Sequence, residues 1–452
     1  MTANATELPY VIVGAGPAGM SLTRAFVRYS VPFVVLERHA DVGGIWNAAH
    51  PGSPIYRSAH FISSRSQSGY LGFAMPEHYP DYPSAAQILA YHQAFVDAYD
   101  LRRHVRFGCA VKSAQPNGEH WQVELESGET LQAAGVICAN GTNWDPILPQ
   151  WPGNFDGEIR HAVSYSDPAE FRSKRVLIVG AGNSGCDIAC DAAQNADAAF
   201  ISLCRGYHFI PKHVFGMPAD EFAARGPKLP MWLAQRIFGA VLKVLVGDLT
   251  KLGLPKPDHR VFESHPIVND QLLHHLRHGD ITARGDIERL DGKEVLFVDG
   301  RREHVDLIIA ATGYRHSIPY LPTDALEWRG SRPRLYMNLF SRRQPALMGM
   351  GFMETDGGAY KLFDEMANVV AQHAADRLRD PARAARFDAI KPEEPDLSGG
   401  VKYLASDRHG NYVQHDAYLA ELRRLRKRMG WQDVRAEDFA AQLNRSGASR
   451  AA

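Results

Sequence analysis

The stretch YVIVGAGPAG at residues 10–19 has a close copy later in the chain, VLIVGAGNSG at residues 176–185. In both, four apolar residues predict a buried strand, and the spacing Gly-x-Gly-x-x-Gly predicts a tight turn into a helix. The first glycine permits the reversal, the second lets backbone N–H groups approach a pyrophosphate, and the third lets the helix pack on the strand. The helix N-terminus then faces the anion. A chain that builds this turn twice is predicted to hold two dinucleotides and to pass electrons between them.

An acidic residue follows the first turn at the position where a ribose would need an acceptor. A helix predicted over 20–26 leads to a second apolar strand, Phe33–Leu36, which ends at Glu37, 23 residues past Gly14. In dinucleotide-binding folds, a carboxylate at this point accepts hydrogen bonds from the ribose hydroxyls. The alternative for Glu37 is a solvated charge at the end of a strand.

An arginine takes the corresponding place after the second turn. The predicted strand Ala198–Cys204 ends at Arg205, 25 residues past Gly180, and no carboxylate stands there. An arginine can pair with a 2′-phosphate, which an acid would repel; an ordinary surface arginine is the alternative. The contrast assigns FAD to the first turn and NADPH to the second, so the sequence predicts a flavoprotein oxidoreductase.

Composition argues against several other classes of protein. The chain has 452 residues, a formal net charge of −1, and 45% hydrophobic and 22% charged residues, as in an ordinary globular protein. This charge balance predicts no capture of nucleic acid. The N-terminus lacks the basic start and apolar stretch of a signal peptide. The apolar segment 231–249 is interrupted by Gln235, Arg236 and Lys243, which disfavours a membrane span. We expect a cytoplasmic protein without stable membrane insertion.

Neither the cysteines nor the histidines form a recognisable redox or metal motif. The five cysteines include no Cys-x-x-Cys pair, which argues against a disulfide reductase. Cys186 and Cys190 share one face of a predicted helix, where small buried thiols are common. His274 and His278 also share a face, but no third ligand is evident, so no metal site is predicted.

The order of the motifs predicts an α/β protein in which one Rossmann-like dinucleotide-binding domain is inserted into another. The FAD domain is expected at residues 1–168 and 291–452, the latter with C-terminal helices. The NADP domain is expected at 169–290, with an irregular insertion at 211–266. A proline-rich stretch, 146–153, marks the crossing between the domains.

Shorter elements complete the predicted FAD domain. Strands at 105–108, 121–126 and 135–138 are expected to form a β-meander, after a helix over 85–99. The apolar run 306–314 ends in a glycine turn and is expected to return to the FAD sheet.

A third motif lies between the two turns. It consists of Phe155, Gly157, His161 and Tyr165 in the pattern Phe-x-Gly-x-x-x-His-x-x-x-Tyr. With the turns on either side, it resembles the identifying sequence of the class B flavin-containing monooxygenases. A tyrosine at the last position resembles the branch of the family that oxygenates nitrogen and sulfur, because the Baeyer–Villiger branch usually carries tryptophan there. Ser166 replaces the basic residue that often follows. The resemblance covers about residues 8–432 and includes three further segments, Gly44-Ile45-Trp46, Ala311-Thr312-Gly313-Tyr314 and Arg408-His409-x-x-Tyr412.

The resemblance implies a known reaction cycle. NADPH passes a hydride to FAD, the reduced flavin captures O2 as a C4a-hydroperoxide, and this transfers an oxygen atom to a small amine or sulfide while NADP⁺ stays bound. The cofactor carries the chemistry, so the protein must orient the nicotinamide and exclude water. Three alternatives stay open: a Baeyer–Villiger monooxygenase of ketones, an uncoupled NADPH oxidase that releases H2O2, and a non-enzymatic redox-sensing protein that retains FAD.

One departure from the family concerns the loop after Gly-Gly-x-Trp. Family members often have a Thr-Asn pair there, whose asparagine contacts the flavin peroxide region and NADP⁺, whereas this chain has Phe61-Ile62. Ser63, Ser64 or Arg65, which follow directly, are the candidate replacement donors; the alternative is that they only turn the loop. Together with Tyr165 they are the predicted catalytic residues.

The motifs and the resemblance together define the expected ligands. We expect a small nucleophilic substrate and O2, and a homodimer is one open possibility for the assembly. His161 is expected to fix the connection between the domains rather than to transfer protons. The predicted cofactor-binding residues are Gly14, Gly16, Pro17, Ala18, Gly19, Glu37, Arg38, Gly44, Ile45, Trp46, Val111, Thr312, Gly180, Gly182, Asn183, Ser184, Gly185 and Arg205.

Overall fold

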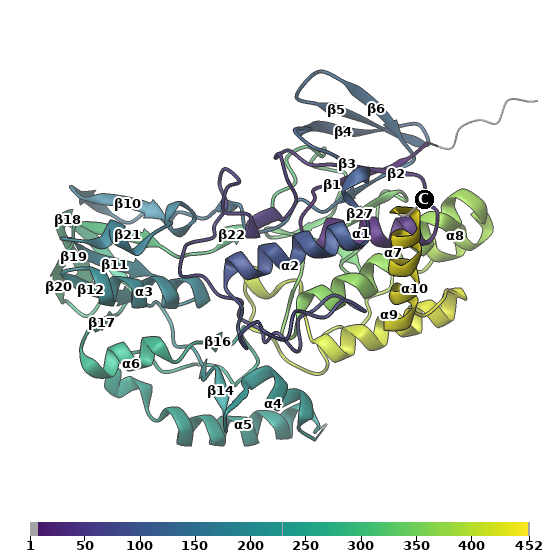
Figure 1. Ribbon diagram of the computed structural model, residues 1–452. Helices are drawn as coiled ribbons and strands as arrows, with labels where there is room; N and C mark the ends of the chain where they lie inside the picture. Colours follow the sequence, from purple (N-terminus) through teal and green to yellow (C-terminus); the bar gives the residue numbers. More distant parts are fainter. Residues whose placement is uncertain (1–7, 228, 451–452) are drawn as a thin grey trace, which may run out of the picture.

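Two sheets organise the chain, and each contains one of the two glycine turns (Figure 1). The computed structural model describes residues 8–227 and 229–450. The sheet with the first turn lies at the right of Figure 1 and the sheet with the second turn at the left, and helices pack on both. The predicted α/β class is therefore confirmed.

The first sheet is built around the strand that precedes the first turn. Its central neighbours run parallel to it, with Val11 opposite Val34 on one side and Val136 on the other. An uninterrupted apolar run suits this position, since a parallel sheet is covered on both faces. From edge to edge the strands are β25 (Leu335–Tyr336), β26 (Phe340–Ser341), β27 (Leu347–Gly349), β7 (Gly135–Cys138), β1 (Tyr10–Val13), β2 (Phe33–Leu36) and β3 (Val105–Arg106).

The second sheet repeats this arrangement around the second turn. All of its strand pairs are parallel, and Val176 lies opposite Ala199 on one side and Leu307 on the other. From edge to edge the strands are β10 (Glu158–His161), β21 (Leu307–Ala310), β11 (Arg175–Val179), β12 (Ala198–Ser202) and β17 (Ile281–Arg284).

We call each sheet with the helices packed on it a unit. In the first unit, helices from the start of the chain pack against helices from its end. α1 (Pro17–Arg28) begins in the first turn and packs against α7 (Ala359–Arg379). Arg24 and Asp364 form a fully buried ion pair at 2.7 Å between them, and the ring of Phe439 lies 3.7 Å from the Arg24 guanidinium carbon. The predicted C-terminal helices are confirmed, and the other helices here are α2 (Ala85–Ala98), α8 (Pro381–Asp388), α9 (His415–Met429) and α10 (Ala436–Arg450).

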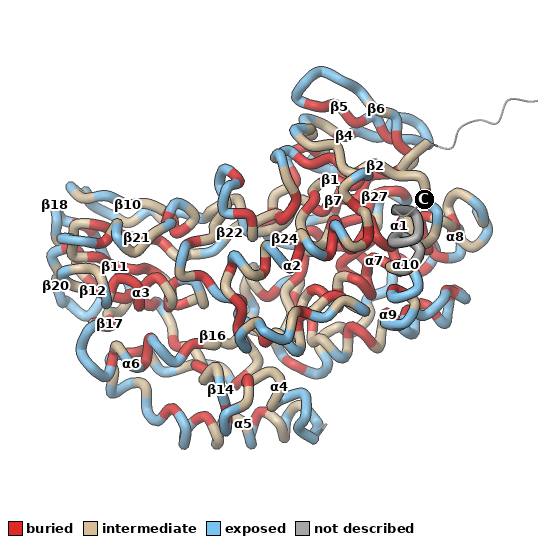
Figure 2. Tube along the Cα trace, in the orientation of Figure 1, coloured by how far each residue is buried: buried red, intermediate tan, exposed pale blue. Residues whose placement is uncertain are grey.

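The second unit has a smaller helical layer. α3 (Asn183–Asn195) begins in the second turn, and α6 (Gln271–His278) packs beside it. Figure 2 shows that buried residues follow the two sheets and the helices packed on them, while the outer loops and helix faces are exposed. Each turn thus lies at the edge of its own hydrophobic core.

The predicted β-meander is confirmed only in part. The strands that form it are β4 (Val111–Asn117), β5 (His120–Leu125) and β6 (Thr130–Ala133). The runs at 105–108 and 135–138 supply β3 and β7 of the first sheet instead. The four residues of β7 are all buried, which a strand of an outlying meander would not be.

The strand after residue 306 joins the second sheet, so the expectation that it returns to the FAD sheet is wrong. β21 pairs with β10 and β11, and β27 takes the place beside β7. A uniformly apolar run predicts burial between two neighbours but not which sheet supplies them. Because strands of the second sheet run from residue 158 to residue 310, the expected boundaries of the inserted domain at 169 and 290 are too narrow.

The segment 211–266, expected to be irregular, contains two helices. α4 (Ala219–Arg225) and α5 (Met231–Val246) follow a hairpin of two short strands. Apolar residues occur around the whole circumference of α5, so no single face reveals the helical period. The short strands are β14 (His213–Val214) and β15 (Met217–Pro218).

Two linkers connect the sheets and pair with each other. β8 (Asp145–Pro146), in the proline-rich stretch, runs antiparallel to β22 (Tyr314–Arg315), which follows β21. The crossing between the two units is therefore a two-stranded ribbon. A small sheet of β9 (Gly153–Phe155), β18 (Ile287–Gly292), β19 (Glu294–Phe297) and β20 (Arg302–His304) packs on the second sheet, at the left of Figure 1.

Candidate nucleotide-binding site

The first turn has the close backbone contacts that its glycines predict. Gly14 has a φ of +108°, and a Cβ there would lie 2.6 Å from the carbonyl oxygen of Ala139. A Cβ on Gly19 would overlap the carbonyl oxygen of Gly14. Gly16 faces Gly44, and a Cβ on Gly16 would lie 3.5 Å from the Gly44 Cα. A side chain is therefore excluded at Gly14 and at Gly19, while the approach of Gly16 to Gly44 is an ordinary van der Waals contact.

Glu37 is held against this turn. The side chain is 5% exposed. One carboxylate oxygen accepts a hydrogen bond from the Ala15 N–H at 2.7 Å, and the other accepts from the His39 N–H at 2.9 Å. The two bonds fix the carboxylate at the end of β2, beside the turn, where it can also accept from ribose hydroxyls.

An aromatic wall stands beside the first turn. Trp46, in the short 3-10 helix Gly44–Trp46, contacts the ring of Phe61 at 5.3 Å. Phe61 in turn contacts Tyr360 at 5.5 Å. A wall of this kind suits a flat ring system and limits the access of water.

The two serines predicted as replacement hydrogen-bond donors, Ser63 and Ser64, form hydrogen bonds with neighbouring protein groups. The Ser63 hydroxyl accepts from Ser68 at 2.7 Å, and the Ser64 hydroxyl lies 3.2 Å from that of Ser66. The Ser64 N–H donates to Asp220 of α4 at 2.6 Å. These contacts favour a structural role for both serines. Next to them Ile62 is 39% exposed.

The second turn has the same backbone but a more open surrounding. Gly180 has a φ of +101°, and a Cβ there would lie 2.6 Å from the carbonyl oxygen of Ala311. Gly185 packs on Gly180 as closely as Gly19 packs on Gly14. At Gly182, however, a Cβ would meet nothing within 4 Å among the described residues. The backbone here faces free space.

The side chains of the second turn differ accordingly. Asn183, the first residue of α3, accepts a hydrogen bond from the Val268 N–H at 3.0 Å. Arg205 is half-buried just beyond β12, with its guanidinium 5.6 Å from the Tyr207 ring. A cation in this place fits a phosphate on the adenosine ribose.

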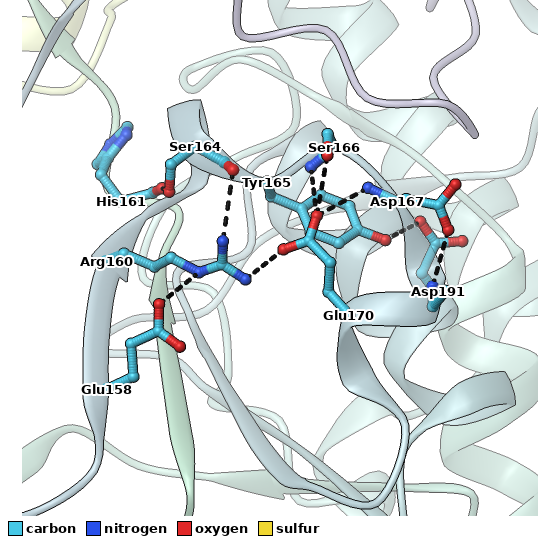
Figure 3. Close-up of polar contacts among 10 residues, drawn as sticks. Glu158, Arg160, His161, Ser164, Tyr165, Ser166, Asp167, Glu170 and Asp191 are labelled. Atoms are coloured by element: carbon cyan, nitrogen blue, oxygen red, sulfur yellow. Dashed lines mark hydrogen bonds and ion pairs between the residues drawn. The ribbon is translucent and has the colours of Figure 1, made fainter.

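Tyr165 of the third motif is buried behind the second turn. It is 1% exposed and stacks on Phe171 at 4.9 Å. Its hydroxyl donates to Asp191 of α3 at 2.8 Å (Figure 3). The same carboxylate oxygen accepts from Ser58 at 2.5 Å. Burial raises the pKa of Asp191 above its ordinary value. These contacts make Tyr165 a brace for α3, and they do not support the predicted catalytic role.

His161 ties the end of β10 to the linker that follows β21, and its expected role in fixing the connection between the domains stays a prediction. Its Nε2 lies 3.1 Å from the carbonyl oxygen of Gly313, and its Nδ1 accepts from the Val163 N–H at 3.1 Å. Burial lowers the pKa of His161, so the neutral ring can donate to one group and accept from the other. Figure 3 shows the neighbouring Arg160, which forms ion pairs with Glu158 and Glu170.

The remaining predicted contacts are spread over the first unit and the linkers. Pro17 is the first residue of α1, and the Arg38 guanidinium lies 5.4 Å from the Trp144 ring. Val111 begins β4 of the meander, away from both turns in sequence. Thr312 follows β21 and donates to the Ile147 carbonyl at 2.5 Å, across the linkers. Contacts of these residues with cofactors stay predictions.

Sequence reasoning missed one segment that reaches the first turn. β27 leads into Gly351, which has a φ of +87° and faces Ala18, where a Cβ would lie 3.7 Å from the Ala18 Cβ. The signal in the sequence was the pair Gly349 and Gly351 directly after the apolar run 346–348.

The structure reveals neither a metal cluster nor a membrane span in the part of the chain that it describes. No three His, Cys, Asp or Glu side chains are grouped to hold an ion among residues 8–227 and 229–450. Within the same ranges, no helix is long and apolar enough to cross a membrane.

Known proteins with similar sequences are named as monooxygenases. The model of the flavin-binding monooxygenase-like family matches residues 9–424. Flavin-containing monooxygenase 5 of Mus musculus is 28% identical over 445 residues, which cover 91% of this chain and 82% of that protein. Indole-3-pyruvate monooxygenase YUCCA1 of Oryza sativa subsp. japonica is 31% identical over 328 residues, which cover 70% of this chain and 79% of that protein.

Solved structures agree at the level of the fold. A mutant form of a flavin monooxygenase from Stenotrophomonas maltophilia has a TM-score of 0.65 and 22% identity and covers 82% of this chain and 99% of its own. An oxidised steroid monooxygenase bound to NADP has a TM-score of 0.70 and 19% identity and covers 94% and 98%. FAD and NADPH, the cofactors expected from the sequence, are those of the family, and the two turns fit them. The chain belongs to the flavin-binding monooxygenase-like family.

Proposed function

We propose that this flavin monooxygenase uses NADPH and O2 to oxygenate a small amine or sulfide. The observation that carries the proposal is the difference between the two turns. The first is covered by Gly44 and bears a buried carboxylate, while the second is open and bears an arginine. The choice of amine or sulfide rests on Tyr165 in the third motif.

In this proposal the residues of the chain bind and orient the two nucleotides and shield the reacting centre from water. The backbone of residues 14–19 holds one pyrophosphate, and Glu37 accepts from the adjoining ribose. The second turn and Arg205 hold NADPH. Trp46 and Phe61 exclude water from the reacting centre. When bound, FAD supplies the redox and oxygen chemistry.

A second outcome, the release of H2O2 without oxygenation, is favoured by the loop at residues 61–65. A branched apolar side chain, Ile62, stands where the family often has an asparagine, and the hydroxyls of Ser63 and Ser64 are already bonded within the loop. We therefore propose that coupling is incomplete. A cytoplasmic location and a homodimer stay predictions.

The test is an incubation of the FAD-loaded enzyme with NADPH, isotopically labelled O2 and matched amines, sulfides and ketones. Mass spectrometry of the products and a parallel H2O2 assay give the fate of each oxygen molecule. We expect label in an amine or sulfide product, with part of the NADPH lost to H2O2. Label in esters formed from ketones alone would make the enzyme a Baeyer–Villiger monooxygenase, and H2O2 alone with every compound would make it an oxidase.

A further inference from the structure

A segment of the first unit, residues 53–61, reaches across to the second unit. Its start is held by the 3-10 helix that covers the first turn, because the Ser53 hydroxyl donates to the Ile45 carbonyl at 2.6 Å. Its end is held just before α2, where the Phe61 N–H donates to the Pro83 carbonyl at 2.8 Å. Both ends of this segment, which we call the bridging segment, are therefore anchored in the first unit.

The middle of the bridging segment docks on α3, the helix that begins in the second turn. The Tyr56 hydroxyl donates to Asp187 at 3.0 Å, and the Ser58 hydroxyl donates to Asp191 at 2.5 Å. The Ala59 N–H donates to the Tyr56 carbonyl at 3.0 Å, so one tight turn carries both hydroxyls. Asp187 and Asp191 are four residues apart and lie on one face of α3. The spacing of the two acids thus matches the spacing of the two hydroxyls.

Each of the two acids accepts one hydrogen bond from each unit. Asp187 also accepts from the Asn269 amide at 2.8 Å, and Asp191 also accepts from the Tyr165 hydroxyl at 2.8 Å. These two donors belong to the second unit, and the bridging segment adds one donor to each acid from the first. Burial raises the pKa of Asp187 and of Asp191, and a desolvated carboxylate needs hydrogen-bond donors. The docked bridging segment therefore completes the hydrogen bonding of α3.

Packing adds to these hydrogen bonds. Tyr56 is 6% exposed, and its ring centroid lies 5.6 Å from that of Tyr165. Tyr56 and Ala59 are part of the same hydrophobic core as the buried residues of α3. Between them, the Arg57 N–H donates to the Ser166 carbonyl at 2.9 Å. A shared core, a ring contact and several hydrogen bonds thus hold the bridging segment in one position on the second unit.

The docked contacts lie close to the second turn. Asn183, the first residue of α3, is four residues before Asp187 and lies on the same face of the helix. The two side chains are also linked through the chain that passes over them, since Asn183 accepts from the Val268 N–H at 3.0 Å and the next residue, Asn269, donates to Asp187. The first unit therefore holds α3 one helical turn away from the backbone that a pyrophosphate would approach.

We propose that Tyr56 and Ser58 are positioning residues for hydride transfer. They hold α3, and with it the nucleotide on the second turn, in a fixed place relative to the flavin on the first turn. The inference rests on the proposed function. A misplacement of about 1 Å can slow a reaction roughly hundredfold, so this contact acts on the rate of hydride transfer rather than on the affinity for the nucleotide.

The test separates nucleotide binding from hydride transfer in the FAD-loaded full chain. Calorimetric titration with 2′,5′-ADP measures binding at the second turn. Anaerobic stopped-flow mixing with saturating NADPH measures the limiting rate of flavin reduction. The change in the visible flavin spectrum on addition of NADP⁺ reports the position of the nicotinamide without turnover.

The variants remove or keep the two hydroxyls. Tyr56→Phe should lower the limiting rate roughly tenfold, and the double variant Tyr56→Phe/Ser58→Ala should lower it further, with unchanged 2′,5′-ADP affinity and a smaller spectral change. Ser58→Thr keeps the hydroxyl and should behave as the wild type does. The matched control is Tyr418→Phe, which removes a buried hydroxyl that donates to the Met337 carbonyl at 2.5 Å within the first unit. It should also behave as the wild type does.

Each outcome decides a separate point. Wild-type limiting rates and spectra in Tyr56→Phe and in the double variant overturn the inference and leave the NADPH site intact. A loss of 2′,5′-ADP affinity at an unchanged limiting rate also overturns it, as does an equal loss of rate in Tyr418→Phe. A wild-type protein that neither binds 2′,5′-ADP nor is reduced by NADPH removes the proposed function itself. If the double variant does not fold, Tyr56→Phe alone decides by the same three measurements.

Discussion

The two glycine turns have nearly the same backbone but opposite surroundings. The first glycine has a φ of +108° in one and +101° in the other, and in both a Cβ would lie 2.6 Å from a carbonyl oxygen of a neighbouring strand's end. The turns differ in what faces their second glycine. Gly16 is covered by Gly44, whereas Gly182 faces free space.

Glu37, which follows the first turn, is also more buried and more firmly held than Arg205, which follows the second. Both oxygens of Glu37 are fixed by backbone N–H groups, and the side chain is 5% exposed. Arg205 is half-buried and rests on a tyrosine ring. The comparison teaches that the first turn has a backbone neighbour at its second glycine and a fixed carboxylate, as suits a resident cofactor, while the second turn is open at that glycine, as suits a cofactor that exchanges.

The largest expected effect comes from filling the second glycine of each turn. Gly16→Val places branched carbons against Gly44, where the pyrophosphate would lie, so the purified variant should lack flavin colour. The matched Gly182→Val should keep its flavin but lose reduction by NADPH. Flavin content of the two purified variants is the measurement, and a yellow Gly16→Val protein would remove FAD from the first turn.

The next largest effect concerns the loop beside the covered turn. Ile62→Asn introduces an amide donor where the side chain is 39% exposed. A preorganised donor is typically worth about 3 kcal/mol, or roughly a hundredfold in rate. Release of H2O2 per NADPH oxidised should therefore fall steeply, while Ile62→Leu should leak as the wild type does. Equal leakage in all three proteins would show that another group protects the oxygen intermediate.

Arg205 should distinguish the open turn by its cofactor preference. Arg205→Ala removes a charge-assisted contact worth about 1.5–3 kcal/mol, so NADPH should bind roughly tenfold or more weakly. NADH has no 2′-phosphate and should be little affected. Flavin reduction rates at varied NADPH and NADH give both affinities. A parallel loss for the two nucleotides would make Arg205 a structural residue.

Different side chains hold the helices that begin in the two turns. Removing one of these contacts is predicted to have a smaller effect, on the free energy of unfolding. α1 is held by the buried pair of Arg24 and Asp364, and α3 by the Tyr165 hydroxyl on Asp191. Tyr165→Phe should lower the free energy of unfolding by about 1–3 kcal/mol, because a buried carboxylate loses a donor. Flavin content should not change. A variant with unaltered stability but no oxygenation would instead restore the catalytic role of Tyr165.

The smallest effect is on pH dependence. Burial raises the pKa of Asp191 in the folded chain above the unfolded value of about 3.9, so folding favours the protonated form. The stability from this preference is full below the unfolded pKa and is lost as pH rises through the folded pKa. Thermal unfolding from about pH 4 to about pH 7 should thus show a flatter profile for Asp191→Asn than for the wild type. Parallel profiles would contradict the raised pKa.

The sequence predicted the two turns because each depends on local pattern. Gly14 and Gly180 indicate a positive φ, and the strand and helix around them follow from apolar runs. Glu37 directly follows β2, and Arg205 lies just beyond β12. Glu37 is buried and Arg205 is half-buried, which agrees with the different ligands predicted from their charges.

Sheet membership and long-range contacts could not be predicted in this way. The run at β21 is apolar throughout, and nothing in it distinguishes a place beside β11 from one beside β7. The bond from Tyr165 to Asp191 spans 26 residues, and that from His265 to Tyr412 spans 147. Such contacts depend on tertiary packing, which leaves no periodic signal in the sequence.

The central claim is that FAD stays bound at the first turn while NADPH exchanges at the second. The most direct test is anaerobic mixing of the desalted protein with NADPH. We expect the protein to remain yellow through desalting, because FAD is held by the covered turn. Its visible flavin absorbance should then bleach stoichiometrically with NADPH and at least about tenfold more slowly with NADH at equal low concentration. A desalted protein without flavin, or a bound flavin that NADPH does not bleach, would contradict the account.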